Sequence, residues 1–279
     1  MPSCALVTGC SAGGIGSALV EELHAQGLRV YATARSSAKM EHLAKLPNVT
    51  LVTLDVVDPI SIAAAVNTVR QDLSLRGDTL GILVNNAGQS LVYPALDTSI
   101  GEAKCLFDVN FWGVLAVTQA FMPLLQVAAN GSIIVNVCSI SGFLYAPWMS
   151  IYNASKSALM SWSETLRLEL QPFKIRVISL VTGTVATNIM SHSNLTLPQS
   201  SLYHKALPEI QARGAGKDVS NKSAPHDFAR QVVQDILGGA SGPVWRGAMA
   251  FMVKAMSKYM PTGIVDRTIK LGTGLDKLP

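Results

Sequence analysis

The chain has 279 residues, of which 49% are hydrophobic and 14% are charged, and its net charge is +4. This apolar composition excludes an intrinsically disordered chain, and the scattered basic residues give no support to nucleic-acid binding. The length suits one large α/β domain, so residues 1–279 are expected to form a single domain.

Cysteine use and the N-terminal residues predict the compartment. Cys4, Cys10, Cys105 and Cys138 form no C-x-x-C pair, and the first residues lack the charged and then apolar pattern of a signal peptide. No apolar run reaches the roughly 18 residues that span a bilayer. These features favour a cytoplasmic protein with free thiols, and association with a membrane surface stays open.

Apolar, β-branched runs alternate with segments of helical period along most of the chain. Buried strands are predicted at Cys4–Gly9, Arg29–Arg35, Val49–Val56, Leu80–Gly88, Gly131–Ser139 and Ile175–Gly183. Strands that alternate with helices form a parallel sheet with right-handed crossovers. We therefore expect an α/β fold, a Rossmann-type doubly wound sheet with helices on both faces, from about residue 3 to about residue 187.

The region beyond this sheet is predicted from composition and period. Residues 188–224 are polar and irregular, and because loops of this length are usually functional, a lid over the site is expected. A helix follows from about Pro225 to Leu237. Residues 243–260 form an amphipathic segment, and one helix face would carry Trp245, Met249, Met252 and Met256. That face predicts either an interfacial helix on a membrane or a stripe packed on the protein's own core.

The first predicted strand runs into a glycine-rich turn. Residues 7–19 read VTGCSAGGIGSAL, with glycines at positions 9, 13, 14 and 16. Backbone N–H groups and the positive end of the following helix make such a turn an anion site that suits a pyrophosphate. Because the spacing is not G-x-G-x-x-G, the loop either binds a cofactor in another register or is only a tight turn.

The ends of three further strands favour a nucleotide. Arg35, with Ser11 and Ser36, suits a 2′-phosphate, whereas an acidic residue there would favour a free ribose hydroxyl; a solvated surface arginine is the alternative. Asp55 is expected to face an adenine. The small residues of Asn85–Gly88 allow the backbone to approach a ribose closely.

Several motifs together resemble the short-chain dehydrogenase/reductase family. They are the T-G…G-I-G loop, N-N-A-G at residues 85–88, Ser139 thirteen residues before Tyr152, and Y-N-A-S-K from Tyr152 to Lys156. The resemblance implies an oxidoreductase that acts on CH–OH and C=O groups, in homodimers or homotetramers. The stretches NNAGQSLVYPALD, SIYNASKSAL and PFKIRVISLVTGTVAT further resemble fungal reductases of the 1-acyldihydroxyacetone-phosphate type, which allows peripheral contact with the endoplasmic reticulum or lipid droplets.

Two departures from the family pattern concern the cofactor. The glycine loop has one extra residue, and alignment on Gly14-Ile15-Gly16 gives close approach and helix packing to Gly14 and Gly16 rather than Gly13. Thr182-Gly183 replaces a Pro-Gly pair, which affects the placement of the nicotinamide. With NADPH as cofactor, the expected binding residues are Gly9, Ser11, Gly14, Ile15, Gly16, Arg35, Asp55, Asn86, Ala87, Gly88, Asn110, Tyr152, Lys156, Val185 and Thr187.

The expected catalytic residues are Ser139, Tyr152, Lys156 and Asn110. Tyr152 and Lys156 lie one turn apart on a helix, and a cation beside a phenol lowers its pKa toward working pH, as a proton donor and acceptor requires. Ser139 is expected to hold the substrate oxygen. By resemblance, Asn110 anchors a water in a proton relay; a buried structural asparagine is the alternative. No metal ion is expected.

Large apolar side chains between Ser139 and Tyr152 predict a small hydrophobic substrate. The candidates for the cleft wall are Phe143, Leu144, Tyr145, Trp148 and Met149; core packing and a dimer interface are the alternatives. A polyketide, terpenoid or steroid ketone from a biosynthetic pathway would fit such a cleft. An acyl-dihydroxyacetone phosphate would also need cations, for which the candidates are His192, His204, Lys205 and Arg213.

Two further function classes stay open at this point. A non-catalytic NADP-binding sensor or scaffold is one, although it has no need for the Ser139, Tyr152 and Lys156 set. The oxidation of an alcohol with NAD is the other, and Arg35 disfavours it.

Overall fold

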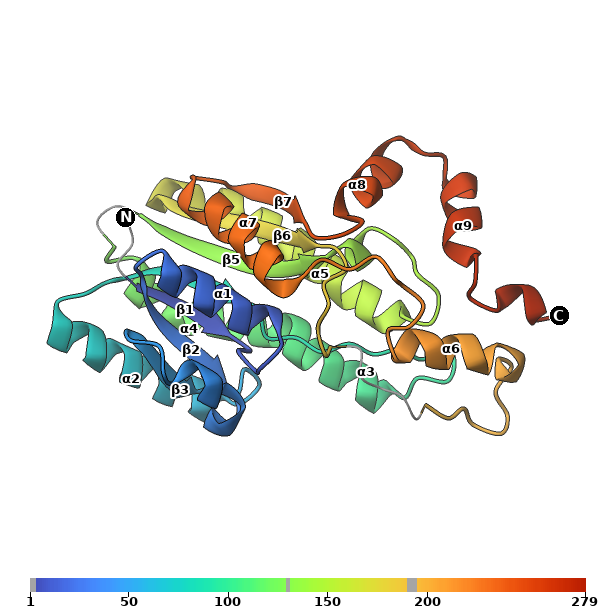
Figure 1. Cartoon of the computed structure of the whole chain (residues 1–279), viewed down its shortest axis with the longest axis horizontal. Helices are drawn as coiled ribbons and strands as arrows, with labels where there is room; N and C mark the ends of the chain where they lie inside the picture. The colour runs from blue at the N-terminus through green and yellow to red at the C-terminus, as the bar shows by residue number, and fades with distance from the viewer. Residues whose placement is uncertain (1–3, 129–130, 190–194) are drawn as a thin grey trace.

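The computed structural model describes residues 4–128, 131–189 and 195–279. Seven parallel strands form one sheet in the order β3-β2-β1-β4-β5-β6-β7 (Figure 1). Their bounds are β1 Cys4–Thr8, β2 Arg29–Ala34, β3 Val49–Thr53, β4 Leu80–Asn85, β5 Ser132–Ser139, β6 Ile175–Thr182 and β7 Gly242–Arg246. The predicted Rossmann-type fold is confirmed, with β7 as a strand that was not predicted.

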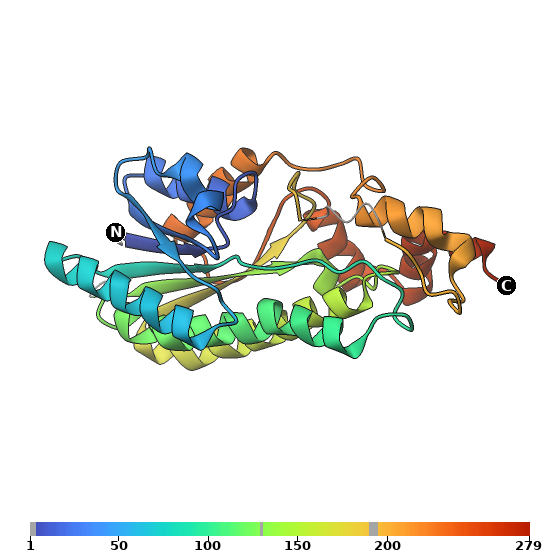
Figure 2. The same ribbon diagram turned by 90° about the horizontal axis from the view of Figure 1, so that it is seen from below.

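Helices cover both faces of this sheet (Figure 2). One layer holds α1 (Ile15–Ala25), the short helix η1 (Ser37–Leu43) and α7 (Pro225–Leu237), and the other holds α2 (Pro59–Arg76), α4 (Gly113–Leu125) and α5 (Ser150–Leu170). Because both faces are covered, the central strands are apolar on both sides. Leu19, Leu23, Phe228 and Val232 fill one core, and Val66, Val69, Val117 and Phe121 fill the other.

The strand order places a ligand site between β1 and β4. The chain builds the sheet outward from β1 to β3, and then returns to add β4 to β7 on the other side of β1. In open α/β sheets, ligands bind beyond the carboxyl ends of the strands at such a switch point. The glycine loop and the N-N-A-G motif both lie there.

One continuous helical stretch is long and apolar enough to cross a membrane by length and composition. It spans Ile100–Leu125 with a mean hydropathy of 1.3, and it joins α3 (Ile100–Phe107), the π-helical turn η2 (Asp108–Trp112) and α4. Charged residues interrupt this stretch, so it is not a continuous apolar run in the sequence. Since α4 buries Val117 and Phe121 against the sheet, it is a core helix in this fold.

The segment predicted as a lid is only partly irregular. It contains the short helix η5 (His204–Ala206) and α6 (Leu207–Gly214). Ile210 of α6 is fully buried in a satellite cluster with Trp148 and Met149. The expectation of a wholly irregular loop is therefore wrong, because α6 has an apolar face that packs in the cluster of Trp148 and Met149.

The single helix predicted over residues 243–260 is also wrong. Trp245 lies on β7, which pairs with β6, and Met249 has a positive φ of 65° before α8 begins at Ala250. On α8 (Ala250–Tyr259) Met256 is buried, whereas Met252 is exposed. The methionine spacing is thus not one face of one helix, because strand pairing takes the first part of the segment.

The remaining elements are short or lie near the C-terminus. They are η3 (Ile140–Gly142), η4 (Gln171–Phe173), α9 (Thr262–Lys270) and η6 (Leu275–Lys277).

Candidate active site

The glycine loop brings β1, α1 and β4 into direct backbone contact. Gly9 has a φ of 74°, and a Cβ there would lie 2.8 Å from the Cα of Ala87. A Cβ on Gly16 would lie 2.5 Å from both the Gly9 carbonyl oxygen and the Asn86 Nδ2. Only glycine fits at these two positions, so the first turn of α1 packs tightly on the ends of two strands.

The extra residue of the loop is accommodated by contact with η1. The backbone N–H of Ala12 donates to the Lys39 carbonyl at 3.1 Å, and that of Gly14 donates to the Ser11 carbonyl at 3.1 Å. A Cβ on Gly13 would meet only Asn188 within 4 Å. Gly14 therefore faces the cavity described below, and the loop between Ser11 and Gly13 leans toward η1.

Thr8 clamps the N-N-A-G motif, a role that the sequence did not reveal. Its Oγ1 accepts hydrogen bonds from the backbone N–H groups of Asn86 and Ala87, both at 2.9 Å. The Asn86 side chain donates back to the Thr8 carbonyl at 2.7 Å. The sequence does show a hydroxyl residue, Thr8, directly before the first loop glycine. Its hydrogen-bond partners could not be inferred from the sequence, because they lie more than seventy residues away in the chain.

Asn110 holds the other end of the same motif. Its Oδ1 accepts from the Gln89 N–H at 2.8 Å, and its Nδ2 donates to the Gln89 carbonyl at 2.9 Å and to the Ser155 hydroxyl at 3.1 Å. The residue is fully buried on the π-helical turn η2, and such turns are frequent at functional sites. The side chain thus has the structural role; its part in a proton relay stays a prediction.

A cavity of about 300 Å³, the glycine-loop cavity, lies at the carboxyl ends of β1 to β4. Ten of the expected cofactor residues line it, namely Gly9, Ser11, Gly14, Ile15, Arg35, Asp55, Asn86, Ala87, Gly88 and Thr187. Lys39 and Gln89 line it as well, and neither was predicted. Arg35 and Lys39 together give one end of this cavity a positive charge.

A second cavity of about 300 Å³, the Tyr152 cavity, adjoins the first. Its lining includes Ser139, Tyr152 and Lys156, which are all buried, and also Val185. The two cavities share Ile15, Asn86, Gly88, Thr187 and Ile189 as lining residues. One elongated ligand can therefore reach from Arg35 to Tyr152.

Three of the four catalytic candidates, Ser139, Tyr152 and Lys156, lie together near the carboxyl end of β5. The Ser139 and Tyr152 hydroxyls are hydrogen-bonded, and Ser139 Oγ also accepts from the Ser141 N–H at 3.1 Å. Lys156 Nζ donates to the Val137 carbonyl at 2.9 Å and lies 5.9 Å from the centre of the Tyr152 ring. The spacing read from the sequence thus places all three on one cavity wall.

The expected lowering of the Tyr152 pKa is wrong for this arrangement. Burial raises the pKa of Tyr152, and the hydrogen bond from Ser139 opposes that rise only in part. Burial also lowers the pKa of Lys156, whose ammonium points to the Val137 carbonyl instead of the phenol. Tyr152 is therefore protonated at neutral pH, the state that can donate a proton.

The structure corrects most of the predicted cleft wall. Met149 and Leu144 line the Tyr152 cavity, but Phe143 packs on Trp245 with ring centres 4.7 Å apart. Tyr145 is 72% exposed. Trp148 is buried in the satellite cluster, where its indole N–H donates to the Thr273 carbonyl at 3.0 Å. None of these three residues lines the cavity, so apolar composition alone did not identify the wall.

Of the three predicted phosphate-binding cations that the structure describes, one lines the Tyr152 cavity. Arg213 lines it and pairs with Asp218 at 2.9 Å. His204 instead contacts the Pro198 carbonyl, and Lys205 lies outside the cavity lining; His192 is outside the described residues. Lys222, which was not predicted, also lines this cavity.

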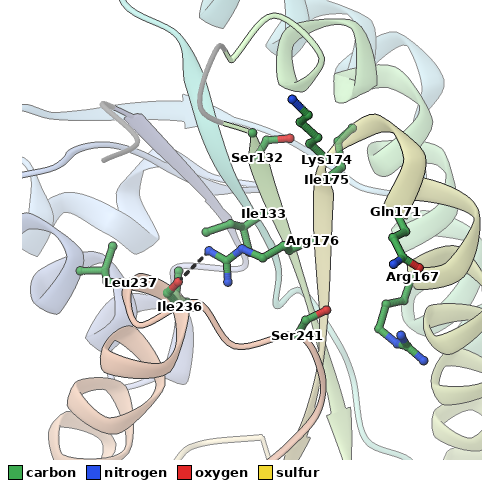
Figure 3. A pocket seen from close by; sticks show the side chains of 11 residues that line it. Ser132, Ile133, Arg167, Gln171, Lys174, Ile175, Arg176, Ile236, Leu237 and Ser241 are labelled. Carbon is green, nitrogen blue, oxygen red and sulfur yellow. Dashed lines mark hydrogen bonds between the residues drawn. The ribbon is translucent and has the colours of Figure 1, made fainter.

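A larger cavity of about 550 Å³ lies at the amino ends of β5 and β6, away from these residues (Figure 3). Its Arg176 guanidinium donates to the carbonyls of Ala240 at 2.6 Å and Ile236 at 3.1 Å. This arginine thus satisfies carbonyls at the end of α7. The cavity holds none of the catalytic candidates.

The chain is similar to a known protein family and to individual members of it. A family model described as "short chain dehydrogenase" matches residues 3–197. The chain is 43% identical to "Short-chain dehydrogenase PC-15" of Penicillium crustosum over 92% of both chains. It is 40% identical to "NADPH-dependent 1-acyldihydroxyacetone phosphate reductase" of Schizosaccharomyces pombe over 71% of this chain and 67% of that one.

Solved structures show the same fold. A short chain dehydrogenase of Burkholderia cenocepacia in complex with NADP aligns with a TM-score of 0.73 and 28% identity. The alignment covers 95% of this chain and 97% of that one.

Proposed function

The chain belongs to the short-chain dehydrogenase/reductase family of oxidoreductases, and from that premise we propose that it uses NADPH to reduce the carbonyl group of a hydrophobic ketone or aldehyde. The observation that carries this proposal is the wall of Ser139, Tyr152 and Lys156, which faces a cavity continuous with the glycine-loop cavity.

The glycine-loop cavity fits NADPH by the chemistry of its lining. Gly14 is the N-cap residue of α1 and makes no side-chain cap hydrogen bond, so the first N–H groups of the helix are available to a pyrophosphate. Arg35 and Lys39 suit the negative charge of a 2′-phosphate. An NADP complex of one relative and the NADPH dependence named for another support the same cofactor.

The chain's own residues supply the acid and the positioning groups. NADPH, when bound, would supply the hydride for the carbonyl carbon. Tyr152 donates its hydroxyl proton to the carbonyl oxygen, so that the product is an alcohol. Ser139 donates a hydrogen bond to the same oxygen and stabilises the negative charge that develops on it. Lys156 places a cation beside the cofactor cavity.

The Tyr152 cavity indicates the substrate class. Most of its wall is apolar, with Leu144, Met149, Val185, Val219 and Met249 among the lining residues. A polar substrate would leave its own groups without partners against this wall. A hydrophobic ketone, such as an intermediate in the biosynthesis of a secondary metabolite, fits better.

Replacing Tyr152 by Phe tests the reaction. NADPH oxidation is followed with long-chain aldehydes, aromatic diketones and cyclic ketones, and NADPH binding is followed by nicotinamide fluorescence. We expect Tyr152→Phe to bind NADPH normally and to lose at least about a hundredfold in kcat. Tyr145→Phe, on the exposed part of the same loop, is the control and should behave like the wild type.

Two results would contradict the proposal. Near-normal turnover by Tyr152→Phe would remove Tyr152 as the acid. Tight NADPH binding by a wild type that turns over no carbonyl compound would favour a nucleotide-binding sensor.

Arg213 and Lys222 favour a second candidate, the reduction of a phosphate-bearing ketone such as a 1-acyldihydroxyacetone phosphate. Both cations line the Tyr152 cavity beside its apolar wall, and Asp218 is the one carboxylate among the described residues of that lining. A pair of acyl ketones that differ only in the phosphate separates the two candidates. A lower KM for the phosphorylated member, lost in Lys222→Gln, would favour the second.

A further inference from the structure

Helices α8 and α9 form an arm that stands out from the body beside α6 (Figure 1). The arm is held at both ends: Ala250 at its start is buried, and Thr273 just after α9 accepts a hydrogen bond from the Trp148 indole. Between these anchors α8 buries only Ala250, Val253 and Met256, and α9 buries no residue. Most of the surface of the arm is therefore exposed.

The exposed face of α8 carries large aromatic side chains. Phe251, Ala255 and Tyr259 follow one another at intervals of four residues, which places them on one face, opposite the buried Val253. Phe251 is 81% exposed and Tyr259 is 74% exposed. Exposed apolar side chains that lie together on one face, unlike ones scattered singly, mark an interaction site.

The same apolar character continues along α9. Ile264 and Leu271 lie seven residues apart, on the side of the helix away from the half-buried Val265 and Ile269. Leu271 is 79% exposed, and Met260 in the turn between the two helices is exposed as well. The arm thus presents apolar side chains outward along its whole length.

Cations flank these apolar side chains. Residues 250–279 contain Lys254, Lys258, Arg267, Lys270 and Lys277 against Asp266 and Asp276, a net charge of +3 out of +4 for the chain. Within the described residues, only Lys277 of these cations forms an ion pair, with Glu209. Lys254 and Lys258 border the Phe251 stripe, and Arg267 and Lys270 border Leu271 by helical position.

The combination of exposed apolar side chains and flanking cations indicates which kind of partner the arm binds. Two copies of the arm packed face to face would bring like charges together, which opposes association. An anionic lipid surface instead complements the charge, and it accepts aromatic and aliphatic side chains into its headgroup region while long basic side chains stay at the phosphates. We propose that the α8–α9 arm docks on an anionic lipid surface, with Phe251, Tyr259 and Leu271 inserted.

The arm also adjoins the Tyr152 cavity, because Met249, directly before α8, lines that cavity. If the proposed function is correct, docking would place this cavity beside the lipid phase, from which a hydrophobic substrate could enter; this step alone rests on the proposed function. Lipid binding itself needs neither substrate nor NADPH, so it can be measured whether or not the proposed reaction is correct.

Vesicle co-sedimentation of the full chain tests the docking. Phosphatidylcholine vesicles with about 30% phosphatidylserine mimic an anionic surface, and pure phosphatidylcholine vesicles are the comparison. We expect binding to the anionic vesicles that weakens as salt is added. The double substitution Phe251→Ser and Leu271→Ser should weaken this binding at least about tenfold, because it removes the inserted apolar surface. Lys254→Gln and Lys258→Gln should each weaken it about fivefold.

Matched controls lie on α2, at the other end of the molecule. Leu75→Ser removes a leucine that is 87% exposed, and Arg70→Gln removes an exposed cation; neither should change vesicle binding. A thermal unfolding midpoint equal to that of the wild type shows that each variant is folded. Equal binding to both kinds of vesicle, or arm variants that bind like the α2 controls, would overturn the proposal. The proposal would also be overturned if sedimentation showed that the wild type is a dimer and that the arm substitutions dissociate it. The exposed face of the arm would then bind a second copy of this chain.

Discussion

Burial, more than any nearby charge, sets the protonation state of Tyr152. The phenol lies inside the Tyr152 cavity wall, and removal from water disfavours its ionised form, which raises its pKa. The Ser139 hydroxyl is the group that opposes this rise. The side chain is thus held as an acid, as the reduction of a carbonyl requires.

The pH dependence of kcat/KM follows from that shift. Because the protonated phenol is the donor and its pKa is raised, activity should be constant around neutral pH and fall only at alkaline pH. Ser139→Ala removes the bond that favours the phenolate, so the alkaline fall should move to still higher pH, while kcat drops roughly a hundredfold or more.

Ser141→Ala is the control for this measurement, because Ser139 Oγ contacts the backbone N–H of Ser141 and not its side chain. An alkaline fall that stays in place in Ser139→Ala would assign it to Lys156, whose pKa burial lowers.

Arg35 and Lys39 should set the preference for NADPH over NADH. Each lines the glycine-loop cavity, and a charge-assisted contact to a 2′-phosphate contributes about 1.5–3 kcal/mol. Arg35→Ala and Lys39→Ala should therefore weaken NADPH binding roughly tenfold to a hundredfold and leave NADH binding unchanged. Nicotinamide fluorescence titrations measure both, with the exposed Lys45→Ala as control. An equal loss of affinity for NADPH and NADH would show that these cations do not bind the 2′-phosphate.

At the scale of elements, a chain of buried amides ties two strands to two helices. Asn85 Nδ2 on β4 donates to Asn136 Oδ1 on β5 and to Thr118 Oγ1 on α4, both at 2.9 Å. Asn136 Nδ2 donates to Ser163 Oγ on α5, also at 2.9 Å. This network fixes α5, and with it Tyr152, against the sheet.

Asn136→Ala should lower the free energy of unfolding by about 2–3 kcal/mol, because it leaves Asn85 and Ser163 with one buried partner fewer. Urea unfolding measures this, and Ser163→Ala added to it should cost less than the two single changes together. The exposed Asn67→Ala on α2 is the control, expected within about 0.5 kcal/mol of the wild type. An equally small effect at Asn136 would mean that water replaces the lost bonds.

Elements with a strong local pattern were predictable from the sequence. Five of the six predicted strands are apolar runs that are almost wholly buried, and the sixth, β3, lies at the sheet edge and is partly exposed. The helix expected at Pro225–Leu237 has those bounds in the structure. Strand β7 was not predicted, because its five residues include Pro243 and lie at the sheet edge. Among the described strands it pairs with β6 alone, more than sixty residues earlier in the chain.

The site shows the same division between local and distant information. Tyr152 and Lys156 are neighbours on one helix, so their spacing was enough to bring them together. The Thr8 clamp and the position of Lys39 in the cavity depend on how distant strands and loops pack, which no local spacing records. Phe143, Tyr145 and Trp148 share one loop and one apolar character with Met149, yet of these four residues Met149 is the one that lines the cavity.

At the scale of the whole molecule, the two cavities draw on different parts of the chain. Apart from residues 187–189, the glycine-loop cavity is lined from residues 9–109. The Tyr152 cavity takes most of its wall from residues 137–249. The last residues brace this second half: Leu275 and Leu278 pack on the cluster of Trp148 and Ile210, and Lys277 pairs with Glu209 on α6.

Removal of residues 275–279 should therefore loosen the substrate half and spare the cofactor half. Loss of two half-buried leucines costs roughly 2 kcal/mol, which corresponds to a Tm lower by about 5 °C. NADPH affinity should be unchanged, KM for the carbonyl substrate should rise, and amide hydrogen exchange should increase in α6. Lys277→Ala is the milder comparison, because an exposed ion pair contributes little. A truncated chain that loses NADPH affinity as well would show that the two halves are coupled through the sheet, since the deleted residues touch only the substrate side.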